Sequence, residues 1–175
     1  MKAYIFQFTL LSSLFLLTTS FNPPAAKVNW LTWDEAIEKS KSDANPKKIF
    51  VDVYTDWCGW CKRMDAITFN NPEVQAYMEA NFYMVKLNAE QREDIIYNDR
   101  TFKFIPNGRR GHHELAVQLL QGKMSYPSVV FLSEDVKIIN IIPGFRQPKE
   151  FLKIASYIGD DAFKNTKWED YQKSK

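Results

Sequence analysis

The sequence predicts one α/β domain, and three observations lead to that prediction. A length of 175 residues suits a single domain with its own core. Short apolar runs, of which residues 49–54 are the clearest, alternate with longer segments that contain good helix formers. The only two cysteines, Cys58 and Cys61, stand directly after that run and before a predicted helix. We therefore expect a central β-sheet flanked by helices.

The composition is that of an ordinary globular protein, with 45% apolar and 25% charged residues. The formal net charge is +2, and lysines alternate with acidic residues instead of forming blocks. This balance creates no overall field that would attract nucleic acid or an anionic membrane surface. We expect no nucleic-acid partner.

The first 20 residues have the features of a secretory signal peptide. Lys2 precedes an apolar run, residues 3–17, that is shorter than the roughly 20 residues of a transmembrane helix. Residues 21–30 are expected to be an N-terminal spacer. An uncleaved signal anchor is the alternative, and it would be the only expected attachment to a membrane. Export predicts a periplasmic or otherwise extracytoplasmic location, where disulfides persist.

The predicted domain comprises residues 31–158, and its first elements have recognisable boundaries. Thr32 and Glu35 match a helix capping box, which predicts a helix to about Ser42. Pro72 suits the first turn of a later helix. After the first helix the expected elements are, in order, a strand at 49–54, a helix from 62, a helix at 72–80 and a strand at 82–87.

Residues 89–122 are predicted to be a helical insertion in the domain. The first part, to Arg100, is polar and charged, and residues 106–108 (Pro-Asn-Gly) are a turn signal. Residues 114–120 form an amphipathic pattern that ends before Gly122, a helix C-cap. The insertion is either a substrate-recognition element near the active-site end of the sheet or a simple surface extension.

The remaining chain predicts a hairpin and a helix. The strands at 129–132 and 136–142 are joined by a short polar turn and lie at the other side of the sheet. A helix is expected from Pro148 to Ile158. Residues 159–175 are expected to be a charged C-terminal tail with one further short helix and a frayed end.

The spacing of the cysteines indicates redox chemistry instead of a structural cross-link. Closing so short a loop restrains the unfolded chain little, by about 2 kcal/mol in the loop-entropy model. Cys58 lies where a strand meets a helix N-terminus, whose N–H groups and partial positive charge stabilise a thiolate. Cys58 is therefore the expected nucleophile and Cys61 the resolving thiol. Zinc binding is the alternative, but zinc usually takes about four ligands, and His112 and His113 are the only candidates to complete such a site.

These features together resemble the thioredoxin superfamily over roughly residues 48–158. A CxxC pair that follows a strand and precedes an X-Pro strand far downstream is a specific combination. The segment 68–74 resembles the secreted, DUF255-related branch of the superfamily. The matching features are Asp52 six residues before Cys58, the motif Trp57-Cys58-Gly59-Trp60-Cys61-Lys62, Val85–Asn88, Tyr126-Pro127-Ser128 and Gly144.

The resemblance implies a thioredoxin-like fold: a central mixed sheet flanked by helices, with the helical insertion before a cis-proline strand. Asp52 would be a buried proton acceptor for Cys61, unless strand alternation places it on a solvated face. The Tyr126–Pro127 bond would be cis and lie opposite Cys58, with the Tyr126 backbone pairing to substrate. An ordinary strand-entry proline is the alternative for Pro127.

The resemblance also implies roles for residues around the motif. Trp57 and Trp60 would form an apolar substrate-contact surface, although either could belong to the core. Lys86 matches a lysine that family members place near the buried aspartate, and an exposed strand lysine is the alternative. His112 and His113 are expected at the surface, at a helix start.

The expected function is that of a thiol–disulfide oxidoreductase acting on disulfide-containing proteins. The chain has no flavin or nicotinamide motif, so no cofactor and no metal are expected, and an unidentified redox partner must recycle the cysteines. Family oxidants often carry histidine before the second cysteine; Trp60 stands there instead, which favours reduction. The alternative is a non-catalytic binding or chaperone module whose aromatic surface (Trp57, Trp60, Tyr126) holds clients without turnover.

Overall fold

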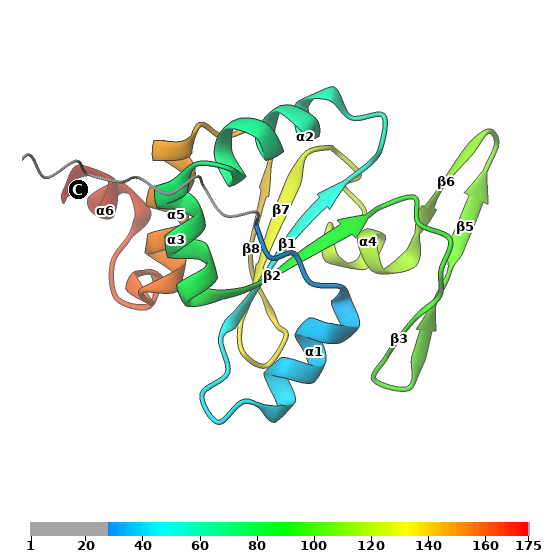
Figure 1. Cartoon of the computed structure of the whole chain (residues 1–175), viewed down its shortest axis with the longest axis horizontal. Coiled ribbons are helices and arrows are strands. Elements are labelled where there is room, and N and C mark those ends of the chain that lie inside the picture. Colours follow the sequence, from blue (N-terminus) through cyan, green and yellow to red (C-terminus); the bar gives the residue numbers. More distant parts are fainter. Residues whose placement is uncertain (1–27, 175) are drawn as a thin grey trace, which may run out of the picture.

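Four strands form the central sheet of the computed structural model, which describes residues 28–174 (Figure 1). Their order is β2-β1-β7-β8; β1 is parallel to β2 and antiparallel to β7, and β8 is antiparallel to β7. The predicted mixed sheet is therefore confirmed. The strands are β1 (Lys48–Tyr54), β2 (Phe82–Asn88), β7 (Ser128–Leu132) and β8 (Ile138–Pro143).

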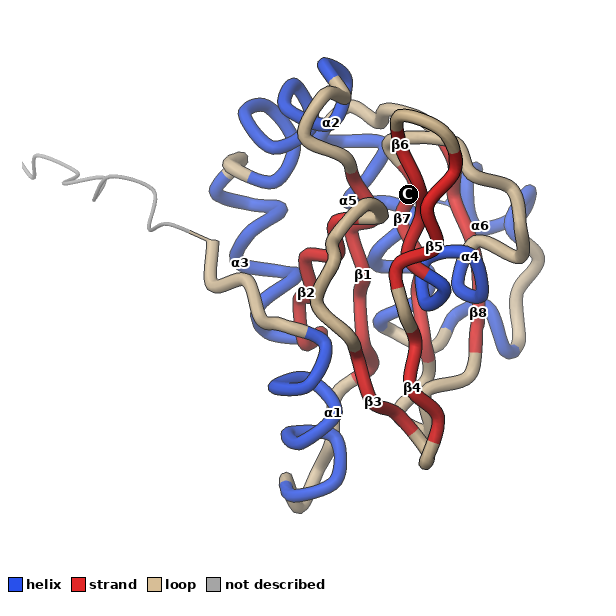
Figure 2. The backbone as a smooth tube through the Cα atoms, turned by 90° about the vertical axis from the view of Figure 1, so that its right-hand side faces the viewer, coloured by secondary structure: helices blue, strands red, loops and turns tan. Residues whose placement is uncertain are grey.

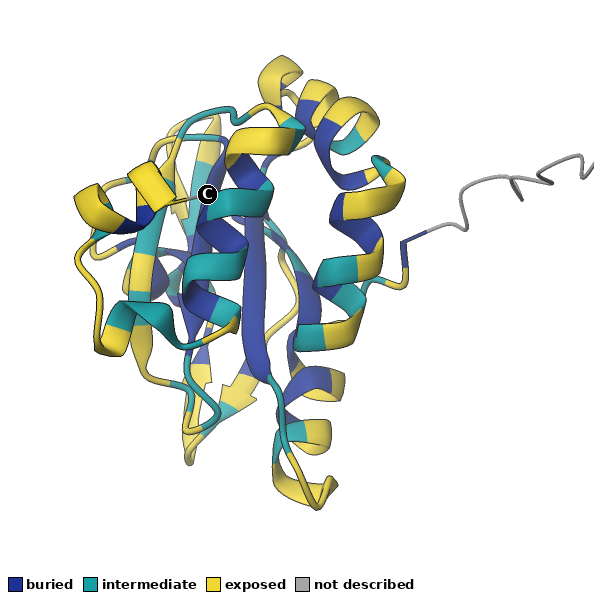
Figure 3. Ribbon diagram, turned by 90° about the vertical axis from the view of Figure 1, so that its left-hand side faces the viewer, coloured by how far each residue is buried: buried dark blue, intermediate teal, exposed yellow. Residues whose placement is uncertain are grey.

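Helices cover both faces of this sheet. Strand alternation directs Val51 towards a core shared with α1 and α4, and Phe50 towards a second core shared with α2, α3 and α5. Figure 3 shows the central strands buried between helices whose outer faces are exposed. The helices are α1 (Trp33–Ser42), α2 (Gly59–Met64), α3 (Pro72–Asn81), α4 (Glu114–Leu119), α5 (Pro148–Gly159) and α6 (Trp168–Ser174), with a π-helical turn η1 (Asp65–Phe69) and a 3-10 turn η2 (Ala162–Lys164).

Local sequence signals determine where α1 and α3 begin. The Thr32 hydroxyl accepts from the backbone N–H of Glu35 at 3.3 Å, and the Glu35 carboxylate accepts from the Thr32 N–H at 2.7 Å. The predicted capping box is thus present. Asn71 caps α3 by accepting from two backbone N–H groups, and Pro72 follows in the first turn.

The folded domain begins before residue 31, where the sequence analysis placed its start. Val28 is buried, Trp30 packs against Phe50 and Phe69, and Leu31 forms a parallel bridge with Val85. The spacer prediction is therefore wrong for residues 28–30, because Trp30 fills a gap in the core that the sequence pattern around it does not reveal. The predicted signal peptide, residues 1–20, lies outside the described residues.

The regular structure of the insertion at 89–122 is mainly β-structure, not helical as predicted. It contains two hairpins, in which β3 (Ile95–Tyr97) pairs with β4 (Arg100–Phe102) and β5 (Phe104–Asn107) pairs with β6 (Arg110–His113). Only its final part, α4, matches the predicted helix. The strands have three or four residues and are largely exposed, so they lack the apolar alternation that marks a strand in a sequence.

Tight turns build both hairpins. Asn98 and Asp99 have φ values of 49° and 60°, which is the backbone of a two-residue hairpin turn. Gly108, in the predicted turn, has φ 60°. Gly111 allows the strands of the second hairpin to approach, because a Cβ there would overlap the Phe104 ring and the Ile105 carbonyl oxygen.

The two hairpins differ in how they attach to the domain. The first is anchored by Ile95 and Phe102, which are buried in the core under α1 and α4. The second, β5–β6, has no buried residue between 104 and 112. Figure 1 shows it at the right-hand edge of the molecule, with its tip directed towards the end that carries α2. We call β5–β6 the arm.

The C-terminal segment is folded on α5 instead of forming a frayed tail. Tyr157 of α5 packs against Trp168 and Tyr171 at ring-centroid distances of 5.1 and 5.0 Å, and Tyr171 is buried. The predicted short helix is α6. Charge dominates the composition here, but three aromatic residues supply enough apolar surface for docking. No helix within residues 28–174 combines the length and apolar character needed to cross a bilayer.

Phe50 lies at the centre of the aromatic core, so we expect a large loss of stability when its side chain is truncated. Its ring contacts Trp30, Phe69, Phe131 and Phe151, and it is fully buried. Phe50→Ala should lower the free energy of unfolding by about 3–5 kcal/mol, because a cavity replaces these contacts. Urea denaturation of the oxidised protein measures this value.

The matched control is Ile96→Ala, which removes an apolar side chain that is 68% exposed. It should change the free energy of unfolding by less than about 0.5 kcal/mol. Equal losses in the two variants would contradict a core centred on Phe50.

Candidate active site

The two cysteines form a disulfide at the junction of β1 and α2. Cys58 is the N-cap of α2; its Sγ accepts from the backbone N–H of Cys61 at 3.0 Å. The Cys58 N–H donates to the Thr55 carbonyl oxygen at 3.1 Å, which fixes the turn that leaves the strand. A sulfur that receives a helix N-terminal N–H is stabilised as a thiolate once the bond opens.

Asp52 is buried, with 1% of its surface exposed, and the alternative of a solvated face is wrong. It pairs in register with Lys86 across β1 and β2, and the Lys86 Nζ lies 2.7 Å from Asp52 Oδ2. By alternation with Phe50, its side chain lies on the face of the sheet that α2 covers. Its other oxygen, Oδ1, has no hydrogen-bond partner among the described residues.

Burial dominates the electrostatics of this carboxyl group. Desolvation raises the pKa of Asp52 to about 6, against the lowering effect of Lys86, and the charge of Asp65 raises it further. A carboxyl with a pKa near neutrality can both accept and release a proton at physiological pH. Asp52 therefore has the acid–base property that its predicted role requires.

Lys86 is the partner that makes this burial possible, and the exposed-lysine alternative does not hold. It forms a second ion pair with Asp65, at the start of η1. Its ammonium also lies 4.8 Å from the centroid of the Trp30 ring and 4.9 Å from that of Tyr54. Burial acts to lower the pKa of Lys86, but both carboxylates act against this and the net direction is upward.

Sequence reasoning missed Asp65 and Trp30 as parts of this cluster. Asp65 is four residues beyond Cys61, so helical spacing could have placed it near the motif. No local sequence signal could have identified Trp30, because it is far from Lys86 along the chain. The bridge between Leu31 and Val85 brings the two residues together.

Tyr126 and Pro127 lie beside the disulfide turn. The Tyr126–Pro127 peptide bond is cis, which is the geometry that the resemblance implied. Pro127 is buried, and its carbonyl oxygen accepts from the Gly144 N–H at 2.7 Å. The Tyr126 ring meets the Trp57 ring edge-on at 5.9 Å, so this strand entry and the cysteine turn are in contact.

Trp57 and Trp60 are surface residues, and the core alternative is wrong for both. Their exposed fractions are 50% and 59%. The Trp57 indole N–H donates to the Glu90 carboxylate at 3.1 Å, and the Trp60 ring packs against Phe145 at 5.5 Å. The two rings therefore form an apolar surface on either side of Cys58.

His113 is fully buried, so its predicted surface position is wrong. It caps α4: its Nδ1 accepts from the Leu115 N–H at 3.3 Å, and its Nε2 lies 3.2 Å from the Glu93 carbonyl oxygen. These contacts fit a neutral ring, and burial lowers the pKa of His113. Within residues 28–174 no three side chains of His, Cys, Asp or Glu gather into a group that could bind a metal.

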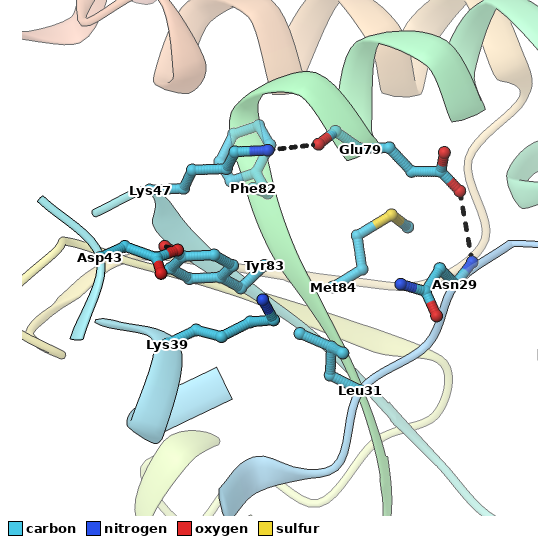
Figure 4. A pocket seen from close by; sticks show the side chains of 9 residues that line it. All are labelled: Asn29, Leu31, Lys39, Asp43, Lys47, Glu79, Phe82, Tyr83 and Met84. Atoms are coloured by element: carbon cyan, nitrogen blue, oxygen red, sulfur yellow. Dashed lines mark hydrogen bonds between the residues drawn. The ribbon is translucent and has the colours of Figure 1, made fainter. Parts of the chain in front are cut away.

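A pocket of about 220 Å³ lies away from the cysteines, between α1, β2 and α3, and none of the predicted site residues lines it (Figure 4). Internal hydrogen bonds occupy several of its polar groups: Lys47 Nζ donates to the Glu79 carbonyl oxygen at 2.7 Å, and the Tyr83 hydroxyl donates to Asp43. It is lined by Asn29, Leu31, Lys39, Asp43, Lys47, Glu79, Phe82, Tyr83 and Met84.

Comparison with known proteins supports a redox interpretation of the disulfide site. A family model named Thioredox_DsbH, described as a protein of unknown function, DUF255, matches residues 7–150. Spermatogenesis-associated protein 20 of Mus musculus is 34% identical over 82 residues, which are 46% of this chain and 10% of that protein. Disulfide bond reductase DsbH of Chlamydia pneumoniae is 31% identical over 68 residues, 39% of this chain and 40% of that protein.

The chain thus spans between a tenth and two-fifths of the length of these two relatives. Among solved structures, a thioredoxin-fold protein from Helicobacter pylori superposes with a TM-score of 0.56 at 21% identity, covering 79% of this chain and 88% of that one. The predicted thioredoxin-like fold is confirmed.

Asp52 predicts a pH-dependent contribution to stability. Its pKa is about 6 in the folded protein against 3.8 for the unfolded chain, so ionisation of this group opposes folding as the pH rises through 6. Asp52→Asn should raise the free energy of unfolding at pH 8 by about 3 kcal/mol, and the difference should vanish below about pH 4. Urea denaturation at the two pH values measures it; a gain independent of pH would contradict the raised pKa.

Lys86 predicts a change in the titration of Asp52. Lys86→Met removes the cation that lowers the pKa of Asp52, so this pKa should move above 6. Carbon-13 NMR of the labelled carboxyl group measures the titration directly. Lys123→Met, at an exposed position, is the control and should leave the Asp52 titration unchanged. An unchanged midpoint in Lys86→Met would show that the ion pair does not tune Asp52.

Proposed function

This chain belongs to the DUF255 family, and from that premise we propose that it is an extracytoplasmic thiol–disulfide oxidoreductase that reduces protein disulfides. The observation that supports this proposal best is the Cys58–Cys61 disulfide, with an N–H of α2 on the Cys58 sulfur. The similarity to disulfide bond reductase DsbH of Chlamydia pneumoniae and this cysteine pair support thiol–disulfide redox function as the general class.

The proposed reaction begins with the dithiol form. The Cys58 thiolate attacks one sulfur of the substrate disulfide, forms a mixed disulfide and releases the other substrate sulfur as a thiolate, which takes a proton from solvent. Cys61 then attacks the Cys58 sulfur and releases the second substrate thiolate. Two electrons pass to the substrate, and the protein is left with the disulfide seen in the structure.

Asp52 is the proposed proton acceptor for the Cys61 thiol. It is buried on the face of the sheet that α2 covers, its Oδ1 is without a hydrogen-bond partner in the described chain, and its pKa is about 6. A carboxylate in this state takes up a proton more readily than one in water. Trp57, Trp60, Tyr126 and the cis Pro127 form the proposed substrate surface.

The direction of reaction and the location rest on the sequence. Trp60 occupies the position before Cys61, so no histidine cation stabilises the thiolate and makes the disulfide oxidising. The relative from Chlamydia pneumoniae carries the name of a disulfide bond reductase. The signal-like residues 1–20 support export. The recycling partner is proposed to be an external dithiol reductant, since the chain contains no flavin or nicotinamide motif.

A non-catalytic binding or chaperone module is the second candidate. The exposure of Trp57 and Trp60, at 50% and 59%, favours it, because large apolar surfaces of this kind hold unfolded clients. The two candidates differ in whether binding depends on the cysteines.

Single cysteine replacements test the reaction. Cys58→Ser should abolish the dithiothreitol-driven reduction of insulin, because the attacking sulfur is lost. Cys61→Ser, reduced and then freed of dithiothreitol, should accumulate the mixed disulfide with insulin, since neither an internal thiol nor the reductant remains to resolve it. Turbidity follows insulin reduction, and mass spectrometry under non-reducing conditions detects the covalent adduct.

Wild-type protein that cannot reduce insulin, but suppresses the aggregation of an unfolded client equally well with and without Cys58, would favour the binding module.

A further inference from the structure

An arginine lies against each of the two exposed tryptophans that flank the disulfide. The Cζ of Arg110, on the arm, is 4.2 Å from the centroid of the Trp57 ring. The Cζ of Arg63, on α2, is 5.8 Å from that of Trp60. Arg110 is far from the cysteines in sequence, so the arm adds to the site a guanidinium group that comes from outside the motif.

A groove of about 410 Å³ lies between the arm and the cysteine turn. Trp57, Met124 and Tyr126 provide its apolar surface, while Arg110, His112 and Glu90 provide its polar groups. Because Tyr126 precedes the cis proline and Trp57 precedes Cys58, the groove begins next to the nucleophile. An extended substrate segment that reaches Cys58 would continue into it.

The charge of the arm is unbalanced. From Lys103 to His113 the sequence contains no acidic residue. Within residues 28–174, neither Arg109 nor Arg110 lies within ion-pair distance of a carboxylate, whereas Arg100 of the neighbouring hairpin pairs with Glu114 at 3.6 Å. Glu90 is the one carboxylate that lines the groove, and it already accepts from the Trp57 indole N–H.

Arg92 adds to this cationic surface. Its guanidinium lies 4.8 Å from the centroid of the Phe104 ring at the base of the arm, and no carboxylate of the described chain pairs with it either. Figure 2, in which the hairpins face the viewer, shows that the tip of the arm and α2 lie at the same end of the molecule. Guanidinium groups that have no carboxylate partner in the described chain thus lie both at the base of the arm (Arg92) and beside the redox site (Arg110).

We propose that the arm is a docking surface for acidic substrate segments. The occupant is an extended segment of a substrate protein in which aspartate or glutamate residues lie next to the disulfide-forming cysteine. Arg109 and Arg110 would pair with these carboxylates, and Trp57 would pack against the adjoining backbone or side chain. This inference rests on the proposed function and names the substrate class for the same site.

The test is a single-turnover competition that needs no recycling partner. Protein reduced with dithiothreitol, and freed of it, is mixed with peptides that contain one disulfide flanked by glutamates, by lysines or by serines. The dithiol passes two electrons to each peptide disulfide, and acid-quenched chromatography measures the reduced peptide. The wild type should reduce the glutamate peptide about tenfold faster than the lysine peptide at low salt, and the ratio should shrink as salt rises.

Charge variants of the arm should change this ratio. Arg109→Gln/Arg110→Gln should bring it to about one, and Arg109→Glu/Arg110→Glu should invert it. Glu90→Gln should increase it, because the carboxylate in the groove is removed. A misfolded arm would lower the rates for all three peptides together, whereas a change of charge alone would alter the ratio of the glutamate to the lysine rate. Circular dichroism and urea denaturation of each variant check that the arm is folded.

The matched control for Arg109→Glu/Arg110→Glu is Lys149→Glu/Lys167→Glu. It makes the same change in net charge at exposed positions on the α5–α6 side, opposite the arm in Figure 1. It should keep the wild-type ratio. A wild-type ratio near one, or one that the arm variants leave unchanged, would overturn the docking proposal alone. Failure of the reduced wild-type protein to reduce any of the three peptides would instead overturn the proposed function.

Discussion

The ammonium group of Lys86 is the point on which the redox end of this protein depends. A carboxylate as deeply buried as Asp52 is costly to ionise, and it can be charged in the folded protein only beside a cation. Lys86 supplies that cation and also pairs with Asp65, where α2 passes into the π-helical turn. The Lys86 ammonium on β2 therefore links strand β1, through Asp52, to the end of the redox helix α2, through Asp65.

Aromatic packing holds that group in place. Trp30 and Phe69 belong to the core around Phe50 and also present their rings to the Lys86 ammonium. The same side chains thus contribute apolar burial to the fold and a favourable cation–π environment to the site. Because Trp30 comes from the segment before α1, a segment far from β2 in the sequence completes the surroundings of Lys86.

The site divides into a buried half around Cys61 and Asp52 and an exposed half around Trp57 and Trp60. Cys61 and Asp52 are buried, and the pKa of Asp52 is poised near neutrality. Trp57 and Trp60 are exposed on either side of Cys58, and the arm adds Arg110 to the exposed half. In the function proposed above, the buried half would tune the reactivity of the cysteines, while the exposed half, on surface loops and a hairpin, would select which disulfides reach them.

The sequence by itself determined the α/β class and the position of the cysteines at the junction of a strand and a helix, because these depend on local periodicity and spacing. The burial of Asp52 was decided by the tertiary structure, in which both faces of β1 are covered. Only the tertiary structure decided the pairing of Lys86 with Asp65, the place of Trp30 in the core, and the folding of residues 95–113 into two hairpins. Those features arise from contacts between distant segments or from short exposed strands held by turns, and neither leaves a periodic signal in the sequence.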